Sequence, residues 1–180
     1  MSRIGKKPID VPNGLDVIVD GNLIKLKSSN GELNYIIPSN IEVKLIDKKI
    51  IVERKSDEKR ERSLHGLART LIYNMATGLT QGYQTVLEIT GVGYKAQLKG
   101  DKLLFALGYS HPVEFPLPKG ITAVVDDKQT TITLKSVDKQ LLGQVCADIK
   151  KLRPPDAYKG KGIRYSGQKI KLKAGKTGKK

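Results

Sequence analysis

The first sixty residues alternate between short apolar runs and polar turns. The apolar runs are DVIV, LIKLK, LNYII, IEVKLI and KIIVER, and the segments DGN, SNG, PSN and DKK separate them. Short alternating runs bounded by such residues predict β-strands joined by tight turns. Asp20-Gly21 predicts a hairpin, because glycine readily adopts the positive φ that a two-residue turn requires.

The hydrophobic period then changes to three and four residues. Six apolar positions share this spacing: Leu64, Leu67, Ala68, Leu71, Ile72 and Met75. They lie on one face of a predicted helix that covers about residues 59–77 and is ended by Gly78.

The second part of the chain repeats this plan. Its strand candidates are TVLEI, YKAQL, LLFALGY, VEFPL, ITAVV and TTITLKS, and a second helical pattern runs from Leu141 to Leu152. Ser136 or Asp138 can cap this helix, and Pro154-Pro155 must end it.

Sliding the chain against itself by 80 positions aligns the two parts. Leu23 then meets Leu103 and Pro38 meets Pro118, with the order of elements preserved. The pattern indicates an internal duplication and an α+β fold, in which two tandem domains each pack a small antiparallel sheet on one helix. We expect the domains at residues 1–81 and 82–152, followed by a basic C-terminal extension at 153–180; a single mixed domain is the alternative.

Charge is concentrated in that extension, which we call the basic tail. The chain carries 33 lysines and arginines against 18 acids, a net charge of +15, and the tail holds ten basic residues and the single acid Asp156. Such an excess predicts a polyanionic partner, either nucleic acid or an acidic membrane surface.

The spacing of residues in the tail favours nucleic acid. Lysines and Arg164 alternate with glycines and with Tyr158 and Tyr165. Cations replace the counterions of phosphates, glycines allow close approach of backbone amides, and tyrosines offer a stacking face. The glycines also disfavour the basic amphipathic helix that a membrane surface would select. Extended tails suit folded RNA better than a regular duplex groove.

Other kinds of chemistry find little support. GVGYKA has the dinucleotide-binding spacing, but a strand-like run follows where a helix is required, and AGKTGKK lacks the first P-loop glycine because Ile170 stands there. His65 reads as a satisfied helix residue and Cys146 as a core residue, while His111 lies in a loop that faces either RNA or solvent. We therefore expect no catalytic residue, no metal and no cofactor.

Neither a membrane span nor secretion is expected from the sequence. No run approaches the roughly 20 apolar residues of a membrane span, and no apolar signal segment follows the basic N-terminus. One cysteine excludes an internal disulfide framework. Asp126-Asp127 are typical of a turn before a strand.

Four segments, MSRIGKKPI, TGVGYKA, LGYSHPV and above all RPPDAYKGKGIRY, resemble the bacterial and plastid large-subunit ribosomal protein L6 family. The resemblance covers essentially the whole chain. It implies two duplicated α+β domains, no enzymatic activity, and binding to large-subunit rRNA close to the sarcin-ricin loop and the docking region of translational GTPases.

The resemblance also implies roles for individual residues, since the second domain and the tail make the main rRNA contacts in that family. RNA-facing roles are implied for Arg153, Tyr158, Lys159, Lys161, Arg164 and Tyr165, and backbone roles for Gly160 and Gly162. Lys95 and the bend at Gly91 and Gly93 are expected near the RNA or the domain junction. Relatives often carry more arginine and an acidic residue later in the tail, so charge alone assigns phosphate contacts to Lys169, Lys171, Lys173 and Lys176.

The hypothesis from the sequence is a structural rRNA-binding protein whose tail is disordered until it binds. Its expected partners are large-subunit rRNA and neighbouring large-subunit ribosomal proteins, with translational GTPases nearby and no membrane. The expected location is the bacterial cytoplasm, with the plastid stroma as the alternative. A free-standing RNA chaperone or DNA-binding module is the competing hypothesis, and an enzyme is a third.

Overall fold

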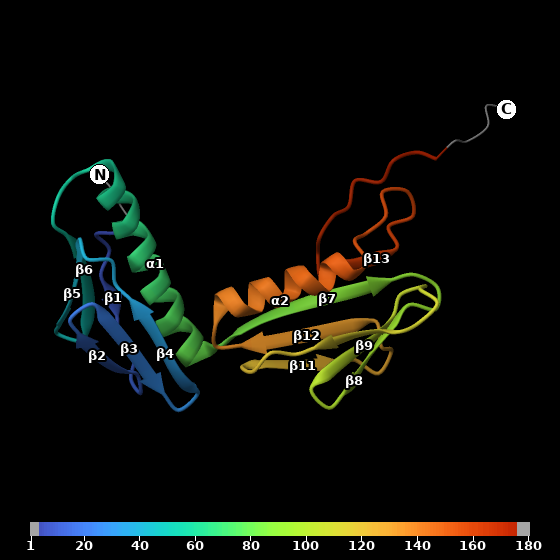
Figure 1. The fold of residues 1–180 in the computed structure, drawn as a ribbon, viewed down its shortest axis with the longest axis horizontal. Coiled ribbons are helices and arrows are strands. Elements are labelled where there is room, and N and C mark those ends of the chain that lie inside the picture. The colour runs from blue at the N-terminus through green and yellow to red at the C-terminus, as the bar shows by residue number, and fades with distance from the viewer. Residues whose placement is uncertain (1–3, 176–180) are drawn as a thin grey trace. The chain divides into compact units, whose positions relative to one another are not determined.

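The computed structural model describes residues 4–175, and the chain forms two compact units (Figure 1). The first unit comprises Met1–Gly82 with Val137–Lys139, and the second comprises Tyr83–Ser136 with Gln140–Lys180. Each unit has its own buried apolar cluster.

The first unit contains six strands and one helix among its described residues. They are β1 (Ile9–Asp10), β2 (Asp16–Asp20), β3 (Leu23–Ser28), β4 (Gly31–Ile36), β5 (Ile41–Ile46), β6 (Lys49–Arg54) and α1 (Lys59–Gln81). The strands form two antiparallel sheets, in the orders β2-β3-β4 and β1-β6-β5, and α1 packs against both. Ile24, Ile50 and Ile72 meet in the core with no exposed surface.

The predicted hairpin is confirmed. Asp20 pairs with Leu23, which leaves Gly21 and Asn22 in the turn, and Gly21 has a φ of 53°. This is the positive φ for which glycine was expected.

Helix α1 is longer than predicted, and the expectation that Gly78 ends it is wrong. Gly78 lies inside the helix, and the following Leu79 is fully buried, so core packing extends α1 by another turn. The helix ends at Gly82, which has a φ of 71° and donates its N–H to the Gly78 carbonyl at 2.9 Å.

His65 is satisfied within the first unit, as predicted. Arg54 donates to its Nδ1 at 3.0 Å, so the opposite ring nitrogen, Nε2, carries the proton that is donated to the Val52 carbonyl at 2.8 Å. Glu61, also buried, accepts from the Ser56 amide at 2.7 Å and from Asn40 at 2.8 Å.

The second unit repeats the architecture and adds a strand. Its elements are β7 (Tyr83–Thr90), β8 (Lys95–Lys99), β9 (Lys102–Ala106), β10 (Val113–Pro116), β11 (Ile121–Val125), β12 (Thr131–Ser136), α2 (Lys139–Leu152) and β13 (Gly162–Tyr165). Its sheets have the orders β10-β9-β8 and β11-β12-β7-β13. Without β13, these are the two sheets of the first unit in the same sequence order, so the predicted duplication and α+β class are confirmed, with two sheets per half rather than one.

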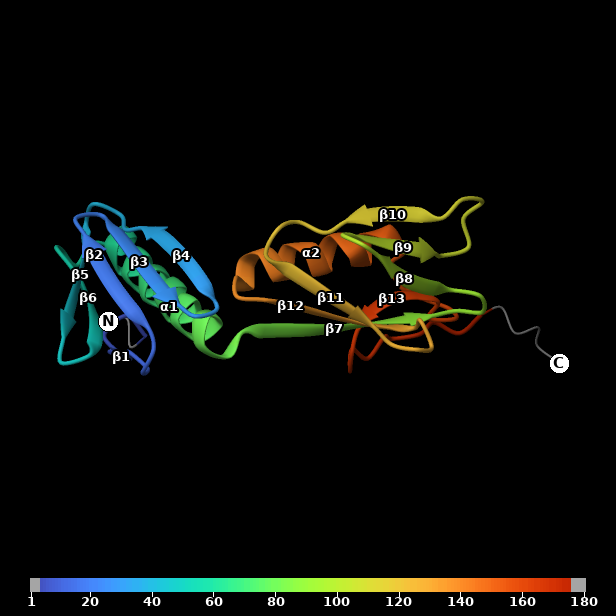
Figure 2. The ribbon, with the colours of Figure 1, turned by 90° about the horizontal axis from the view of Figure 1, so that it is seen from below.

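Strand β13 comes from the basic tail and lies beside β7 (Figure 2). Ile163 pairs with Ile89 and is itself fully buried in the core that Phe105, Leu134 and Ile149 form. The expectation that the whole tail is disordered is therefore wrong for Gly162–Tyr165, because their burial and pairing belong to the second unit itself. Cys146 is 1% exposed in the same core, as predicted.

The packing of α1 yields a stability prediction. Ile72→Ala removes a fully buried side chain and should lower the free energy of unfolding by about 2–5 kcal/mol. Leu67→Ala, on the same helix but 51% exposed, should change it by less than about 0.5 kcal/mol. Urea unfolding followed by circular dichroism measures both, and equal effects would contradict the assignment of the core.

Candidate nucleic-acid interface

Three segments that are distant in sequence meet around the side chain of Tyr94. A Cβ placed on Gly91 would lie 2.8 Å from the Tyr94 ring, and one on Gly108 would lie 2.9 Å from it. Glycine is therefore required at both positions, because its missing side chain lets the ring lie against the backbone. The TGVGYKA and LGYSHPV segments are thus packed together.

The tail joins this cluster through Arg153. Its guanidinium lies 5.0 Å from the centre of the Tyr109 ring, and hydrogen bonding to Tyr109, followed by the effect of Tyr94, raises its pKa. Tyr109 in turn donates its hydroxyl to the Leu152 carbonyl at 2.9 Å. Arg153 thereby connects the start of the tail to both other segments.

Gly162 brings the tail back to the end of α2. Its φ is 139°, and an added Cβ would lie 2.6 Å from the Pro154 carbonyl oxygen and 2.7 Å from that of Arg153. The next residue, Ile163, donates its N–H to the Arg153 carbonyl at 2.8 Å. Gly162 thus allows a close approach of two backbone segments within the protein, and its expected backbone role toward RNA stays a prediction.

Arg164 is paired within the sheet. It lies opposite Glu88 in the β13–β7 register, and its Nε donates to the Glu88 carboxylate at 3.0 Å. The Ser166 hydroxyl donates to the other carboxylate oxygen at 2.7 Å. The hydrogen bond from Ser166, followed by that from Arg164, lowers the pKa of Glu88. The Arg164 side chain keeps 35% of its surface exposed.

Tyr165 is also held by the fold. Its ring packs against the core of the second unit, and burial, followed by the effect of Cys146, raises its pKa. Lys150 Nζ lies 4.9 Å from the ring centre and donates to Gln168 at 3.1 Å. Tyr165 is therefore half-buried, without an open stacking face.

Residues 156–161 form a closed loop that displays Tyr158, Lys159 and Lys161 to solvent. Asp156 donates its N–H to the Lys161 carbonyl at 2.9 Å and accepts from the Gly160 N–H at 3.0 Å. Its carboxylate accepts from the Lys159 N–H at 2.8 Å. The Gly160 amide is thus occupied within the loop, contrary to the expectation that glycine amides approach phosphates here.

The later tail returns to this loop. Lys173 donates its N–H to the Ala157 carbonyl at 2.7 Å. The Leu172 side chain packs near Gly160, because a Cβ placed on Gly160 would lie 3.6 Å from Leu172 Cδ2. The side chains of Lys169, Lys171 and Lys173 are exposed, as is that of Lys95 on β8; Lys176 and most of the AGKTGKK segment lie outside the described residues.

Several residues of this surface were missed by the sequence reasoning. Glu88, Tyr109, Lys150 and Gln168 acquire their roles only through contacts with the tail. Their roles follow from the register of β13 on β7. That register could be predicted only if the tail were already known to form a strand.

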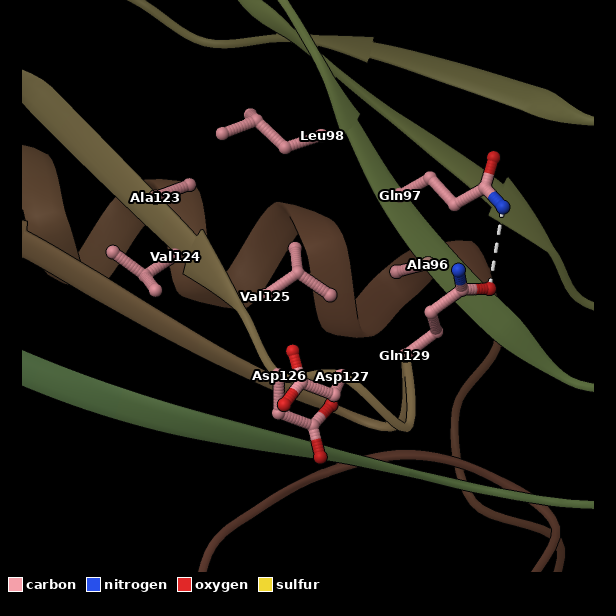
Figure 3. Close-up of a pocket in the computed structure, with 9 residues that line it drawn as sticks. All are labelled: Ala96, Gln97, Leu98, Ala123, Val124, Val125, Asp126, Asp127 and Gln129. Atoms are coloured by element: carbon pink, nitrogen blue, oxygen red, sulfur yellow. Dashed lines mark hydrogen bonds between the residues drawn. The ribbon is translucent and has the colours of Figure 1, made fainter.

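A groove between β8 and β11 is the main alternative site (Figure 3). Asp126 accepts from the Thr130 and Thr131 amides at 2.9 Å each, so it is a turn residue, as predicted. Gln97 donates to Gln129 at 3.2 Å across one end of the groove. The remaining lining is largely apolar, and no nucleophile–base pair is present among the nine lining residues.

Within residues 4–175, no group of three or more histidine, cysteine, aspartate or glutamate side chains is arranged to hold a metal ion. No described helix is long and apolar enough to cross a membrane.

Comparison with known proteins agrees with the motif segments. The profile of the ribosomal protein L6 family matches residues 11–82 and 90–166. The large ribosomal subunit protein uL6 of Thermodesulfovibrio yellowstonii is 54% identical over 180 residues, all of both chains. The protein of the same name from Caldicellulosiruptor saccharolyticus is 52% identical over 179 residues, 99% of this chain and 98% of its own.

The close approach at Gly162 can be tested by adding a methyl group. Gly162→Ala should weaken β13 by about 1–3 kcal/mol, because the new Cβ would overlap the Pro154 carbonyl. Amide exchange of Ile163 measures the effect. Gly143→Ala, in α2, where the new Cβ would meet open space beyond its own helix, should instead be neutral or stabilise by about 1 kcal/mol. Unchanged Ile163 exchange in Gly162→Ala would contradict the geometry.

The lowered pKa of Glu88 predicts that the stability of the β13–β7 pairing depends on pH. Its pKa is lowered in the folded state, so its stabilising effect is present above the ordinary value of 4.5 and is lost as pH falls through the lower folded value. Protection of the Ile163 amide, corrected for intrinsic exchange, should therefore decrease below about pH 4.5. Glu88→Gln should lower protection at neutral pH and flatten this profile, and identical profiles in the two proteins would argue against the pairing.

Proposed function

The chain belongs to the ribosomal protein L6 family, a family without enzymatic activity, and on that premise we propose that it is a structural constituent of the large ribosomal subunit. Its partners are large-subunit rRNA and neighbouring ribosomal proteins. In keeping with the family resemblance, it binds close to the sarcin-ricin loop and to the docking region of translational GTPases, and supports subunit assembly. Its two bacterial relatives favour the bacterial cytoplasm over a plastid.

The single observation that carries this proposal is the exposed cationic surface of the second unit. Lys159 and Lys161 project from the 156–161 loop, and Lys169, Lys171 and Lys173 follow on the segment that returns to it. Lysine offers a point charge rather than arginine's planar fork, so these side chains neutralise phosphates and do not read bases.

Other residues of the site serve this surface in two ways. Tyr158 is 57% exposed and offers a ring on which an unpaired base can stack. Arg153, Arg164 and Tyr165 are half-buried: they hold the surface in place, and their remaining exposed parts face the same RNA. Lys95 adds a cation from β8.

A salt titration tests the proposal. Replacing Lys159, Lys161 and Lys171 together by glutamine should lower affinity for large-subunit rRNA. It should also reduce the slope of log K against log salt by about 2, because each phosphate contact contributes about 0.7–0.9. The matched control replaces Lys119, Lys128 and Lys135, which are exposed elsewhere in the second unit, and should leave the slope unchanged.

Chemical footprinting of the same complexes identifies the partner. The wild-type chain should protect one compact rRNA region that includes the sarcin-ricin loop or its neighbours. Equal slopes in both triple variants, or many weak footprints in place of one, would refute the proposal and favour a free-standing RNA chaperone.

A further inference from the structure

The chain contains two asparagine-glycine pairs, Asn13-Gly14 and Asn30-Gly31, both at turns of the first unit. Asparagine is a thermolabile residue, because the backbone nitrogen of the next residue can attack its carboxamide carbon. Glycine in the next position favours this attack, since it has no Cβ to obstruct it and its backbone is the least restricted. The two pairs therefore share the same intrinsic chemistry, and the fold around each pair decides which one reacts.

Asn30 is held against the end of α1. Its Nδ2 donates to the Leu79 carbonyl at 2.8 Å, and the Ser28 hydroxyl donates to the same oxygen at 2.9 Å. That carbonyl is one of the last four of the helix, which have no partner inside it. Gly31, the residue that would attack, pairs with Ser28 in the β3–β4 register. Attack at Asn30 therefore requires the hydrogen bond to break and the hairpin to open.

Asn13 has no such restraint. It lies in an exposed turn between β1 and β2, in which the Leu15 N–H donates to the Pro12 carbonyl at 3.3 Å. Among the described residues, no hydrogen bond holds the Asn13 carboxamide or the Gly14 N–H. Gly14 has a φ of 84°, and no atom beyond its chain neighbours lies within 4 Å of the position that a Cβ would take. The Asn13 side chain is thus free to approach the Gly14 nitrogen.

We propose that Asn13 is a site of spontaneous deamidation. The Gly14 nitrogen attacks Cγ of Asn13, so that an N–Cγ bond forms and the Cγ–Nδ2 bond breaks. The hydrogen of the Gly14 N–H leaves with the side-chain NH2 as ammonia, and water then opens the resulting succinimide to aspartate or isoaspartate. The reaction consumes a water molecule and requires no oxidant, reductant or enzyme. This modification site goes beyond the proposed function and is independent of it.

The position of Asn13 gives the modification a structural consequence. Isoaspartate directs the main chain through the former side chain and lengthens it by a carbon atom. After the turn, Leu15 is 6% exposed in the core of the first unit; before it, the Val11 N–H donates to the Lys48 carbonyl at 2.9 Å. The extra atom must be accommodated between these two anchors. Isoaspartate should therefore break the hydrogen bond from Leu15 to Pro12 and weaken the packing of Leu15.

Mass spectrometry of the ageing protein tests the proposal. The folded full chain is incubated at mildly alkaline pH, and its peptides are followed with time. Asn13 should deamidate faster than Asn30 by about tenfold or more, because the hydrogen bond and the strand pairing at Asn30 must open first. In urea that unfolds the chain, the two pairs should react at comparable rates, since the restraint on Asn30 is then lost.

Two variants are the matched controls. Asn13→Gln should show no reaction at this turn, because its longer side chain closes a less favourable ring. Asn13→Asp adds the same charge without lengthening the main chain. Exchange of the Leu15 amide should therefore rise in the aged wild-type protein and stay unchanged in freshly prepared Asn13→Asp.

The rates in the folded protein decide the outcome. Deamidation of Asn30 at the same rate as Asn13, or faster, would overturn the inference. So would an intact Asn13 in the folded protein over a time in which the urea-unfolded chain reacts. None of these measurements involves RNA, so their outcome is separate from that of the salt titration.

Discussion

The close approach of Gly162 to the end of α2 is the constraint on which the second unit's surface depends. Pro154 and Pro155 end the helix, and the chain must return within a few residues to lie beside β7. A side chain at position 162 would overlap two carbonyl oxygens, so only glycine allows β13 to form there. Once β13 is in place, Ile163 completes the core and Arg164 lies opposite Glu88.

The duplication explains why the extra strand matters. Both halves contain the same two sheets, and the second half differs by one strand at the edge of β7. Without β13 that edge would present unpaired backbone groups, as sheet edges do. Because β13 pairs with this edge, the basic tail is fixed to the second unit and its lysines are displayed at a defined position. The specialisation of the second half is therefore an addition to the shared fold and leaves the repeated sheets unaltered.

The sequence predicted the fold better than the site. Alternation, turn glycines and helical spacing are local signals, so the strands, the Asp20-Gly21 hairpin and both helices could be read directly. The prediction that Gly78 ends α1 was wrong because a glycine can be buried within a helix, and the following Leu79 is needed in the core. The pairing of Arg164 with Glu88 spans 76 positions and depends on a strand that has only four residues, so no local pattern indicates it.

The charge of the tail overstates the number of phosphates it can neutralise. Glu88 balances Arg164, while the Arg153 guanidinium lies over the Tyr109 ring and supports the fold. Only cations that are free to neutralise a phosphate, and so displace the counterions condensed on the RNA, contribute to the salt dependence of affinity. The exposed lysines meet that condition, whereas an arginine already paired with a carboxylate meets it weakly. Lysine-to-arginine exchange should therefore matter least at the exposed positions, where a point charge suffices, and most at Arg164, whose fork-shaped side chain forms two contacts with one carboxylate.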